Sequence, residues 1–392
     1  MEKRGEGRGL HFETLVVESG VPGAIVPPID TQKAQPWDSL DEQPRYPYSR
    51  SCPDRSVEAL EAKVAALHGD GAIARAFASG QAATDAILST IKEESHLLCG
   101  EQVYGTTRAV IEGNLRGVEK SFVEPTLAIL EKAARPNTTH LLIETPTNPL
   151  LKVVDLEEVQ EFSERHNVKW VLDNTFGTMF LIDGFAYGAH TVYYSASKYF
   201  GGHHDAIGGV VVTKDPGFAE ELRLKRKWRG SVMAPDTAYR INIEMQTMAL
   251  RMRRECDNAS LVAGYLQGHP KVERVYYPGL PGHPGHEVAA RQMRAIDGEE
   301  NRFGAIVSFE VRGNYRDFAN WIAANNRVVY LMESLGSNTT ILSNPYNMSH
   351  SSVSPEKKKE LGIKESLFRL SVGIGRVDDI IGCLGQGLSQ LK

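Results

Sequence analysis

The chain has 392 residues, and 44 Lys and Arg against 49 Asp and Glu give a formal net charge of −5 at pH 7. With 41% hydrophobic and 24% charged residues, the composition is typical of a folded globular protein and excludes wholesale disorder. A negative net charge gives no general attraction to nucleic acid or to an acidic membrane. No apolar stretch is long enough to cross a bilayer, and MEKRGEGRGL lacks the apolar segment of a secretion signal.

The four cysteines, Cys52, Cys99, Cys256 and Cys383, are far apart, and no two form a CxxC pair. Isolated cysteines are typical of reduced thiols and argue against a disulfide framework or a zinc centre. We therefore expect a cytoplasmic protein without a metal site.

Three parts follow one another along the chain. Residues 1–45 are rich in proline and polar residues with little periodicity, so we expect an N-terminal arm that lies on a second subunit. Residues 46–250 contain a helical pattern and then short apolar runs that alternate with amphipathic stretches. The runs lie at 72–78, 96–100, 140–144, 169–173, 191–195 and 208–213. They predict an α/β domain with a mainly parallel sheet that helices cover on both faces.

Residues 251–392 have a different pattern of apolar and polar residues, which predicts a smaller C-terminal α+β domain. A helical stretch at 258–267 precedes a Gly/Pro-rich loop, and strands are expected within 303–311 and 366–374. In the second of these strands, Phe368 and Leu370 alternate with Arg369. The alternation places Arg369 off the core face.

The most informative stretch is YYSASKYFGGHHDAIGG, residues 193–209. Lys198 lies just past a predicted buried strand, between small hydroxyl residues and a glycine-rich turn. A lysine in a partly dry pocket can lose its proton and form a Schiff base with an aldehyde. The alternative is an ordinary surface lysine at a strand end.

Other polar residues lie where predicted strands end, the place where ligands bind in such sheets. Asp173 could face a cationic ring nitrogen, and Ser79, Gly80 and Gln81 lie at a predicted helix start, where backbone N–H groups bind phosphate. Tyr104 could stack on an aromatic ring. Tyr48 and Arg50, at the end of the arm, offer a hydroxyl and a guanidinium for a phosphate. Together these groups meet the needs of pyridoxal phosphate.

At these residues the sequence resembles the Cys/Met-metabolism family of pyridoxal-phosphate enzymes, which includes cystathionine γ-synthases, cystathionine γ-lyases and methionine γ-lyases. The resemblance covers nearly the whole chain, in order. Its motifs are YSRS (48–51), ASG (78–80), VYG (103–105), ETPTNPLLKVVD (144–155), DNTF (173–176), SASKYFGGHHD (195–205), YPGLPGHP (277–284), ESLG (333–336), MSHSS (348–352) and RLSVGI (369–374).

The resemblance implies a role for each matching residue. Lys198 would carry the cofactor and move protons, with Tyr104 as the second catalytic residue. Substrate binding would fall to Asn148, Glu333, Ser334 and Arg369. The cofactor-binding residues would be Ser79, Gly80, Gln81, Asp173, Thr175, Ser195 and Ser197, together with Tyr48 and Arg50 acting on the phosphate of a neighbouring subunit.

The resemblance also implies fold and activity. We expect fold type I of the pyridoxal-phosphate enzymes, and γ-substitution or γ-elimination on a homoserine-derived or sulfur-containing amino acid. The reaction would pass through an aldimine of Lys198 and a vinylglycine-type intermediate. The partners would be the amino-acid substrate and copies of the same chain, in a dimer with shared sites or a tetramer. Three alternatives stay open: a C–S β-lyase, a biosynthetic γ-transferase with an unusual carbon or nitrogen nucleophile, and a non-catalytic binding protein.

Three features bear on these alternatives. The cystathionine γ-lyases and γ-synthases of the family resemble this chain in having a glutamate at the position of Glu333. The β-lyases tend to have an aromatic residue there. The segment SNTTI, residues 337–341, replaces a glycine-rich family pattern, so we expect a changed wall beside the substrate. RLKRKWRG, residues 223–230, is unusually basic and is interpreted either as a solvated helix face or as a rim that attracts an anionic substrate.

Overall fold

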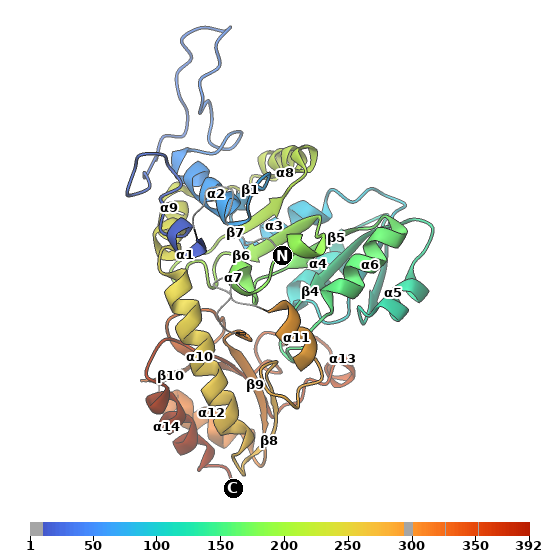
Figure 1. Ribbon diagram of the computed structural model, residues 1–392, viewed down its shortest axis with the longest axis vertical. Coiled ribbons are helices and arrows are strands. Elements are labelled where there is room, and N and C mark those ends of the chain that lie inside the picture. The colour runs from blue at the N-terminus through green and yellow to red at the C-terminus, as the bar shows by residue number, and fades with distance from the viewer. Residues whose placement is uncertain (1–10, 294–300, 326, 352) are drawn as a thin grey trace.

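The computed structural model describes residues 11–293, 301–325, 327–351 and 353–392. Two sheets organise this part of the chain, one of seven strands and one of five (Figure 1). The larger sheet consists of β1 (Ile73–Phe77), β2 (His96–Gly100), β3 (Glu119–Val123), β4 (Thr138–Glu144), β5 (Lys169–Asp173), β6 (Thr191–Ser195) and β7 (Gly209–Thr213). The predicted α/β class is confirmed.

The large sheet has the order β1-β7-β6-β5-β4-β2-β3. Its strands run parallel except β7, which is antiparallel to both of its neighbours. The carboxyl ends of β1, β4, β5 and β6 therefore meet at one edge of the sheet. Residues that directly follow these strands are brought together there, although they are far apart in sequence.

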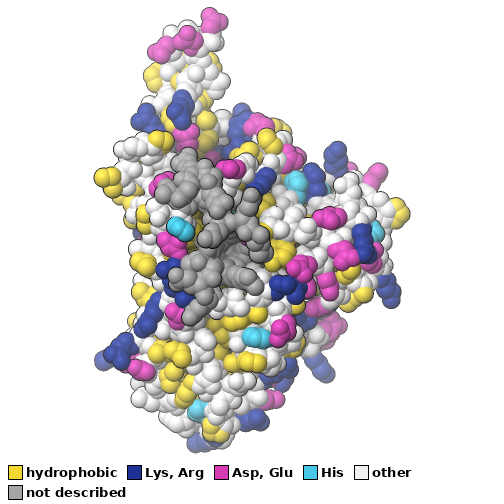
Figure 2. Space-filling model, in the orientation of Figure 1, with side chains coloured by type: hydrophobic (Ala, Val, Ile, Leu, Met, Phe, Trp, Pro, Cys, Tyr) yellow, Lys and Arg dark blue, Asp and Glu magenta, His cyan; other side chains and the backbone are white. Residues whose placement is uncertain are grey.

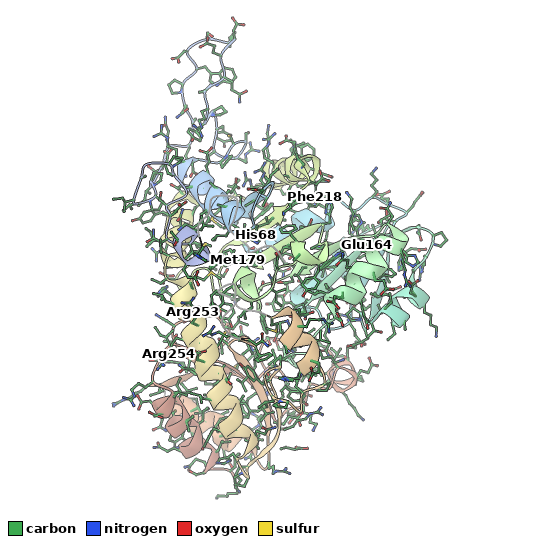
Figure 3. All side chains as sticks on the ribbon, in the orientation of Figure 1. His68, Glu164, Met179, Phe218, Arg253 and Arg254 are labelled. Atoms are coloured by element: carbon green, nitrogen blue, oxygen red, sulfur yellow. The ribbon has the colours of Figure 1, made fainter. Side chains whose placement is uncertain are left out.

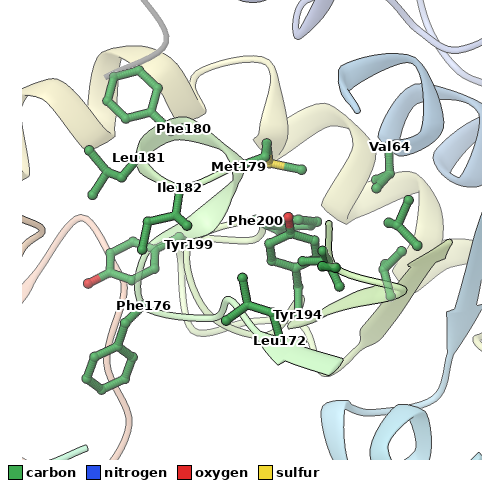
Figure 4. Packing of buried hydrophobic residues seen from close by; sticks show 14 of the residues in the cluster. Val64, Leu172, Phe176, Met179, Phe180, Leu181, Ile182, Tyr194, Tyr199 and Phe200 are labelled. Carbon is green, nitrogen blue, oxygen red and sulfur yellow. The ribbon is translucent and has the colours of Figure 1, made fainter. Parts of the chain in front are cut away.

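Apolar side chains cover both faces of this sheet. Along β4, Leu141 and Ile143 belong to one buried cluster and Leu142 to another. This alternation is expected of a strand whose two faces are both covered. Figure 4 shows the first cluster, where Leu172 and Tyr194 pack below the turn that carries Phe180.

Helices connect the strands and cover the sheet. They are α2 (Arg55–Leu67), α3 (Gly80–Leu88), α4 (Gly105–Asn114), α5 (Leu127–Ala133), α6 (Leu156–His166), α7 (Thr178–Leu181), α8 (Pro216–Arg229) and α9 (Pro235–Met245), with a 3₁₀ turn at Phe185–Tyr187. Several begin with a side-chain cap: Asp54 accepts the backbone N–H groups of Ser56 and Val57 at the start of α2. After α2, the ring of His68, which is labelled in Figure 3, is hydrogen-bonded to the hydroxyl of Tyr194 on β6 at 2.7 Å.

The smaller sheet has the order β10-β11-β12-β9-β8 and is mostly antiparallel. Its strands are β8 (Val272–Tyr276), β9 (Ile306–Val311), β10 (Val329–Leu331), β11 (Thr340–Ser343) and β12 (Leu367–Ser371). The helices of this part are α11 (His286–Gln292), α12 (Tyr315–Ala324), α13 (Pro355–Glu360) and α14 (Val377–Leu388). One face of α14 is apolar and packs here, since Ile380, Leu384 and Leu388 lie in the core of the small sheet.

The long helix α10 (Met248–Gln267) links the two parts (Figure 1). Its first half packs into the core of the large sheet through Met248 and Met252. Its second half packs into the core of the small sheet through Val262 and Leu266. We propose that the two domains, 46–250 and 251–392, meet within this helix.

The N-terminal segment differs in part from the predicted arm. A short helix, α1 (Phe12–Leu15), buries both of its terminal side chains in the large core of its own chain. Glu13 forms an ion pair with Arg253 on α10, the residue labelled there in Figure 3. Residues farther along are exposed, including Ile25 and Leu40, and this part projects from the molecule as a long loop (Figure 1).

Acidic and basic side chains intermingle over the face of the molecule in Figure 2. Within the described ranges, no helix is both long and apolar enough to span a membrane.

Candidate active site

A pocket of about 340 Å³ lies beyond the carboxyl ends of the large sheet, where the loops of the small sheet approach it. It brings together every predicted site residue except Tyr48 and Arg50. These lining residues are Ser79, Gly80, Gln81, Tyr104, Asn148, Asp173, Thr175, Ser195, Ser197, Lys198, Glu333, Ser334 and Arg369. Strand ends and the turn before β11 therefore converge on one cavity.

Lys198 follows β6 and is held in the pocket by a polar contact. Its Nζ donates a hydrogen bond of 2.9 Å to Oγ of Ser334. The pKa of Lys198 is lowered to about 8, mainly because the amine is buried and also because Arg369 is positively charged, while Glu333 acts in the opposite sense. A lysine with this pKa has a substantial neutral fraction near pH 8 and can act as a nucleophile or base.

The backbone around Ser334 is shaped for close contact with Lys198. Ser334 itself has a φ of 86°, which non-glycine residues seldom adopt, and Gly336 has a φ of 71°. A Cβ atom on Gly336 would lie only 3.1 Å from the Cβ of Lys198. Glycine at this position lets the turn approach the lysine.

The start of α3 forms the phosphate-binding side of the pocket. Ser79 caps the helix, and its Oγ accepts the N–H of Ala82 at 3.0 Å. The first turn of a helix leaves backbone N–H groups that bind an anion well. Gly80 lies against Ser195, so closely that an added Cβ would come within 2.9 Å of the serine Cβ. Ser197 faces the same region, with its Oγ accepting the N–H of Gly208 at 3.0 Å.

Asp173 ends β5 as a buried carboxylate. One of its oxygens accepts the N–H of Thr175 at 3.0 Å, and burial raises its pKa. Within the described ranges, Asp173 has no Lys or Arg as an ion-pair partner. A protonated ring nitrogen would supply the missing positive charge. This carboxylate, the helix start at α3 and the amine of Lys198 together fit pyridoxal phosphate.

Arg369 on β12 is almost fully buried, with 3% of its surface exposed. Its guanidinium donates to Oδ1 of Asn148 and to the carbonyl oxygen of Ser334, both at 2.9 Å. Its Nε is buried and has no hydrogen-bond partner among the described residues. Burial lowers the pKa of Arg369 to about 10, so the side chain stays positively charged at neutral pH. A fixed cation with a free donor is suited to a substrate carboxylate.

Tyr104 and Glu333 lie at the open side of the pocket. Tyr104 directly precedes α4 and is 37% exposed, and Glu333 is exposed as well. Thr175 has its hydroxyl turned to the backbone, where Oγ1 accepts the N–H of Ser195 at 2.9 Å.

Tyr48 and Arg50 are outside the pocket of their own chain. Tyr48 is 43% exposed, and the guanidinium of Arg50 lies over its ring, 5.3 Å from the centroid. Arg50 also donates to the carbonyl oxygen of Lys227 at 3.2 Å. That these residues serve the phosphate of a neighbouring subunit stays a prediction.

The position of residues 337–341 differs from the expectation that they change the wall beside the substrate. The segment 337–341 does not line the pocket, where this stretch of chain contributes only Glu333, Ser334 and Leu335. Ser337 instead hydrogen-bonds with Thr339, at 2.8 Å between the two hydroxyls. The expected change in the substrate wall is therefore wrong for residues 337–341, because this segment turns away to begin β11.

The basic segment lies on α8, and most of its charges are paired within the chain. Arg226 is buried and contacts Glu61 at 2.6 Å. Arg229 pairs with Asp85 at 2.5 Å, and Nζ of Lys225 donates to the carbonyl oxygen of Ser89 at 2.7 Å. These contacts favour the interpretation as a helix face over that of a rim.

Six lining residues were not predicted from the sequence: Thr84, Glu144, Phe176, Tyr193, Leu335 and Ser349. Glu144 and Phe176 lie inside the motifs ETPTNPLLKVVD and DNTF, and Ser349 inside MSHSS. Those motifs could have directed attention to them. Tyr193 begins the stretch 193–209 that carries Lys198, and Leu335 lies inside ESLG. Thr84 lines the pocket from inside α3, and no local signal marks it.

Comparison with known proteins agrees with this geometry. A family model described as Cys/Met metabolism PLP-dependent enzyme matches residues 17–389. The chain belongs to this family. It is 36% identical to a cystathionine gamma-lyase of Bacillus subtilis over 97% of this chain and 99% of that protein. It is 39% identical to a cystathionine gamma-synthase of Mycobacterium bovis, covering 84% and 83%, and 35% identical to a cystathionine beta-lyase of Lactococcus lactis, covering 97% and 99%.

A solved cystathionine gamma-lyase of Lactobacillus plantarum, complexed with L-serine, superposes with a TM-score of 0.91. The two sequences are 34% identical, and the match covers 97% of this chain and 99% of that structure. The chain therefore has the fold of the Cys/Met-metabolism enzymes and is itself an enzyme of amino-acid metabolism whose cofactor is pyridoxal phosphate. When bound, this cofactor withdraws electrons from a substrate carbon beside it.

Proposed function

We propose that this enzyme catalyses elimination or substitution at the γ-carbon of a homoserine-derived or sulfur-containing amino acid. Its relatives of the Cys/Met-metabolism family act as lyases or synthases on sulfur amino acids, which supports the reaction class. The finer assignment to the γ-carbon rests on the residues around Lys198.

Each group has a part in this proposal. Arg369 and Asn148 bind the substrate α-carboxylate, because Arg369 has a buried donor without a partner. Lys198, whose pKa is lowered to about 8, removes the proton at Cα and moves a proton at Cβ. Ser334 orients the amine through the hydrogen bond at 2.9 Å. Asp173 would hold the ring nitrogen of pyridoxal phosphate, and Tyr104 would stack on the cofactor ring and relay protons.

Glu333 is the observation that carries the γ assignment. It lines the pocket together with Lys198 and Arg369, and its charge acts on the pKa values of both. A carboxylate at this opening can pair with the distal ammonium of a cystathionine-like substrate and accept a proton as the γ-substituent leaves. The aromatic residue expected of a β-lyase would not offer that charge. The competing interpretation is a surface glutamate that merely caps the turn beginning at Ser334.

We also propose a cytoplasmic homo-oligomer. Tyr48 and Arg50 are exposed and do not line the pocket of their own chain, which supports a dimer with shared sites or a tetramer built from such dimers. All four cysteines lie in the described ranges and are free thiols, as expected in a reducing compartment.

The two segments that would permit a γ-transferase with an unusual nucleophile, 337–341 and 223–230, do not favour that alternative in the structure. Residues 337–341 do not line the pocket, and the basic residues of α8 are largely paired. The β-lyase alternative keeps one support, the relative from Lactococcus lactis named a cystathionine beta-lyase.

The proposal is tested with Glu333→Ala and Glu333→Gln assayed on two substrates. Cystathionine has a distal ammonium group and O-acetylhomoserine has none. Because Glu333 is exposed, its charge pairing is screened, and we expect kcat/KM for cystathionine to fall roughly threefold or more beyond the fall for O-acetylhomoserine. Glu164→Ala, an exposed glutamate on α6 (Figure 3), serves as the matched control. Equal losses on both substrates would reject the pairing role.

A further inference from the structure

Glu144 is a buried residue of the pocket at the carboxyl end of β4. Only 6% of its surface is exposed. Each of its two oxygens accepts a different backbone N–H group. Oε2 accepts from Tyr104 at 2.9 Å, and Oε1 accepts from Asn148 at 2.8 Å. A single side chain thus holds two loops, the one between β2 and α4 and the one that follows β4.

The two loops carry different functional parts of the pocket. Tyr104 and Asn148 both line the cavity. Asn148 in turn accepts a hydrogen bond of 2.9 Å from Nη1 of Arg369. A displacement of Asn148 would therefore also disturb the contact with Arg369. A backbone N–H group that loses its acceptor away from water costs free energy, so Glu144 stabilises this arrangement of the two loops.

The electrostatic setting of Glu144 is unusual. It lies opposite Asp173 in the sheet register, so two buried carboxylates are neighbours. Burial, followed by the negative charge of Asp173, raises the pKa of Glu144 well above its ordinary value, while the two N–H donors and Arg369 oppose this shift. In either protonation state each oxygen keeps a lone pair, so both hydrogen bonds can persist.

We propose that Glu144 is a positioning residue that fixes the loops of Tyr104 and Asn148 to the end of β4 and thereby aligns the ring-stacking and carboxylate-binding sides of the pocket. The parts assigned to Tyr104 and Asn148 rest on the proposed function. The attachment of the two loops does not depend on which reaction the enzyme catalyses.

Glu144→Gln tests the proposal with almost no change in shape. The amide has one acceptor oxygen, and its nitrogen is a donor that would face a backbone N–H. We expect the holoenzyme of this variant to exchange amide hydrogens faster at residues 101–105 or 147–151, by roughly tenfold or more, since one buried hydrogen bond to a carboxyl is lost. Hydrogen-exchange mass spectrometry measures both segments. Wild-type exchange rates in both segments would overturn the proposal.

Glu255→Gln is the matched control. Glu255 lies on α10, is fully buried, and neither of its oxygens has a hydrogen-bond partner among the described residues. Burial raises its pKa to about 8, so it is mostly neutral at pH 7 and glutamine is a close substitute. Exchange at residues 101–105 and 147–151 should be unchanged in this variant. Faster exchange there would show a general loosening of the fold and overturn the assignment to Glu144.

Glu144→Asp gives an independent outcome and carries the test if the glutamine variant does not fold. Aspartate keeps the acceptors but is one methylene shorter, so it can reach only one of the two loops. We expect faster exchange in one segment and a wild-type rate in the other. Wild-type rates in both, with full activity, would contradict the two-loop role.

Steady-state kinetics separate positioning from a general structural effect. Misplacing Asn148 should raise KM for the amino acid by roughly tenfold in Glu144→Gln, with a smaller change in kcat, whereas partial unfolding lowers the active fraction at constant KM. If the loops loosen but the wild-type enzyme shows no γ-chemistry, the proposed function fails and the role of Glu144 stands. If the loops do not loosen, the role fails whatever the reaction is.

Discussion

Two regions of the molecule carry residues predicted to hold the cofactor phosphate, and they differ in burial. Gly80 and Ser195 lie in the pocket, packed against one another at the start of α3. Tyr48 and Arg50 lie near the end of the exposed N-terminal segment, outside that pocket. A group that serves its own chain must be in place within the fold, whereas a group that serves a neighbour is left at the surface. The proposed shared site accounts for this difference: Gly80 and Ser195 would serve the phosphate of their own chain, and Tyr48 and Arg50 that of a partner.

The largest expected effect comes from the pocket region, at Lys198. In Lys198→Ala, turnover should fall by at least about 10²–10⁴-fold, because Lys198 is the one lysine among the described residues that line the pocket. The visible absorbance of covalently held cofactor should be lost as well. Circular dichroism should stay that of the wild type, since the lysine contributes one polar contact at its tip. Cofactor still reducible by borohydride onto another lysine would refute the assignment.

The exposed region is tested by mixing subunits. Arg50→Ala and Lys198→Ala homo-oligomers should each be nearly inactive. A hybrid dimer of the two places one intact pocket opposite one intact arm, so we expect a partial recovery of activity after the subunits are exchanged. Activity is compared with mixtures kept from exchanging. No recovery in hybrids verified by mass spectrometry would show that the two regions do not cooperate across subunits.

The pH dependence of cofactor uptake also distinguishes the pocket from the exposed N-terminal segment. Because the pKa of Lys198 is lowered to about 8, its neutral fraction rises with pH and levels off above that value. Uptake of pyridoxal phosphate by the apoenzyme should therefore accelerate by about tenfold per pH unit below pH 8 and flatten above it. The return of visible absorbance measures the rate. Arg50→Ala should keep the same midpoint, and a rate that still rises steeply up to pH 10 would contradict a lowered pKa.

The smallest effect is expected beside the arm, in the basic segment of α8. Changing Lys225, Lys227 and Arg229 to Gln removes a hydrogen bond to Ser89 and an ion pair with Asp85 that is partly exposed. We expect a stability loss of about 1 kcal/mol or less for that ion pair and a KM within about twofold of the wild type. A marked rise in KM with a flatter salt dependence would instead support an anion-attracting rim.

The sequence alone predicts which polar residues lie at the strand ends. It does not predict side-chain contacts between residues that are far apart in the chain. Asp173 and Lys198 were predicted as site residues because parallel strands with buried runs end at one edge, and motif matches added Arg369. The pairing of Arg226 with Glu61 could not be predicted, since the two residues are 165 positions apart and each is an ordinary charged residue in a helix. For the same reason the basic segment had two open interpretations.

Glu144 shows a second limit of prediction. Its motif was recognised, yet its contacts join backbone groups 40 and 4 positions away, and backbone donors carry no residue-specific signal. The docking of α1 cannot be predicted from the sequence, because Phe12 and Leu15 are too few to create a helical period within a polar segment.

Product identity tests the central claim most directly. The purified holoenzyme is incubated with L-cystathionine, and separately with O-acetylhomoserine and a thiol, and the products are identified by mass spectrometry. Chemistry at the γ-carbon predicts 2-oxobutanoate and ammonia from elimination, or a γ-thioether from substitution, and both should disappear in Lys198→Ala. Pyruvate as the main product from cystathionine would contradict the γ assignment and establish a β-lyase in its place.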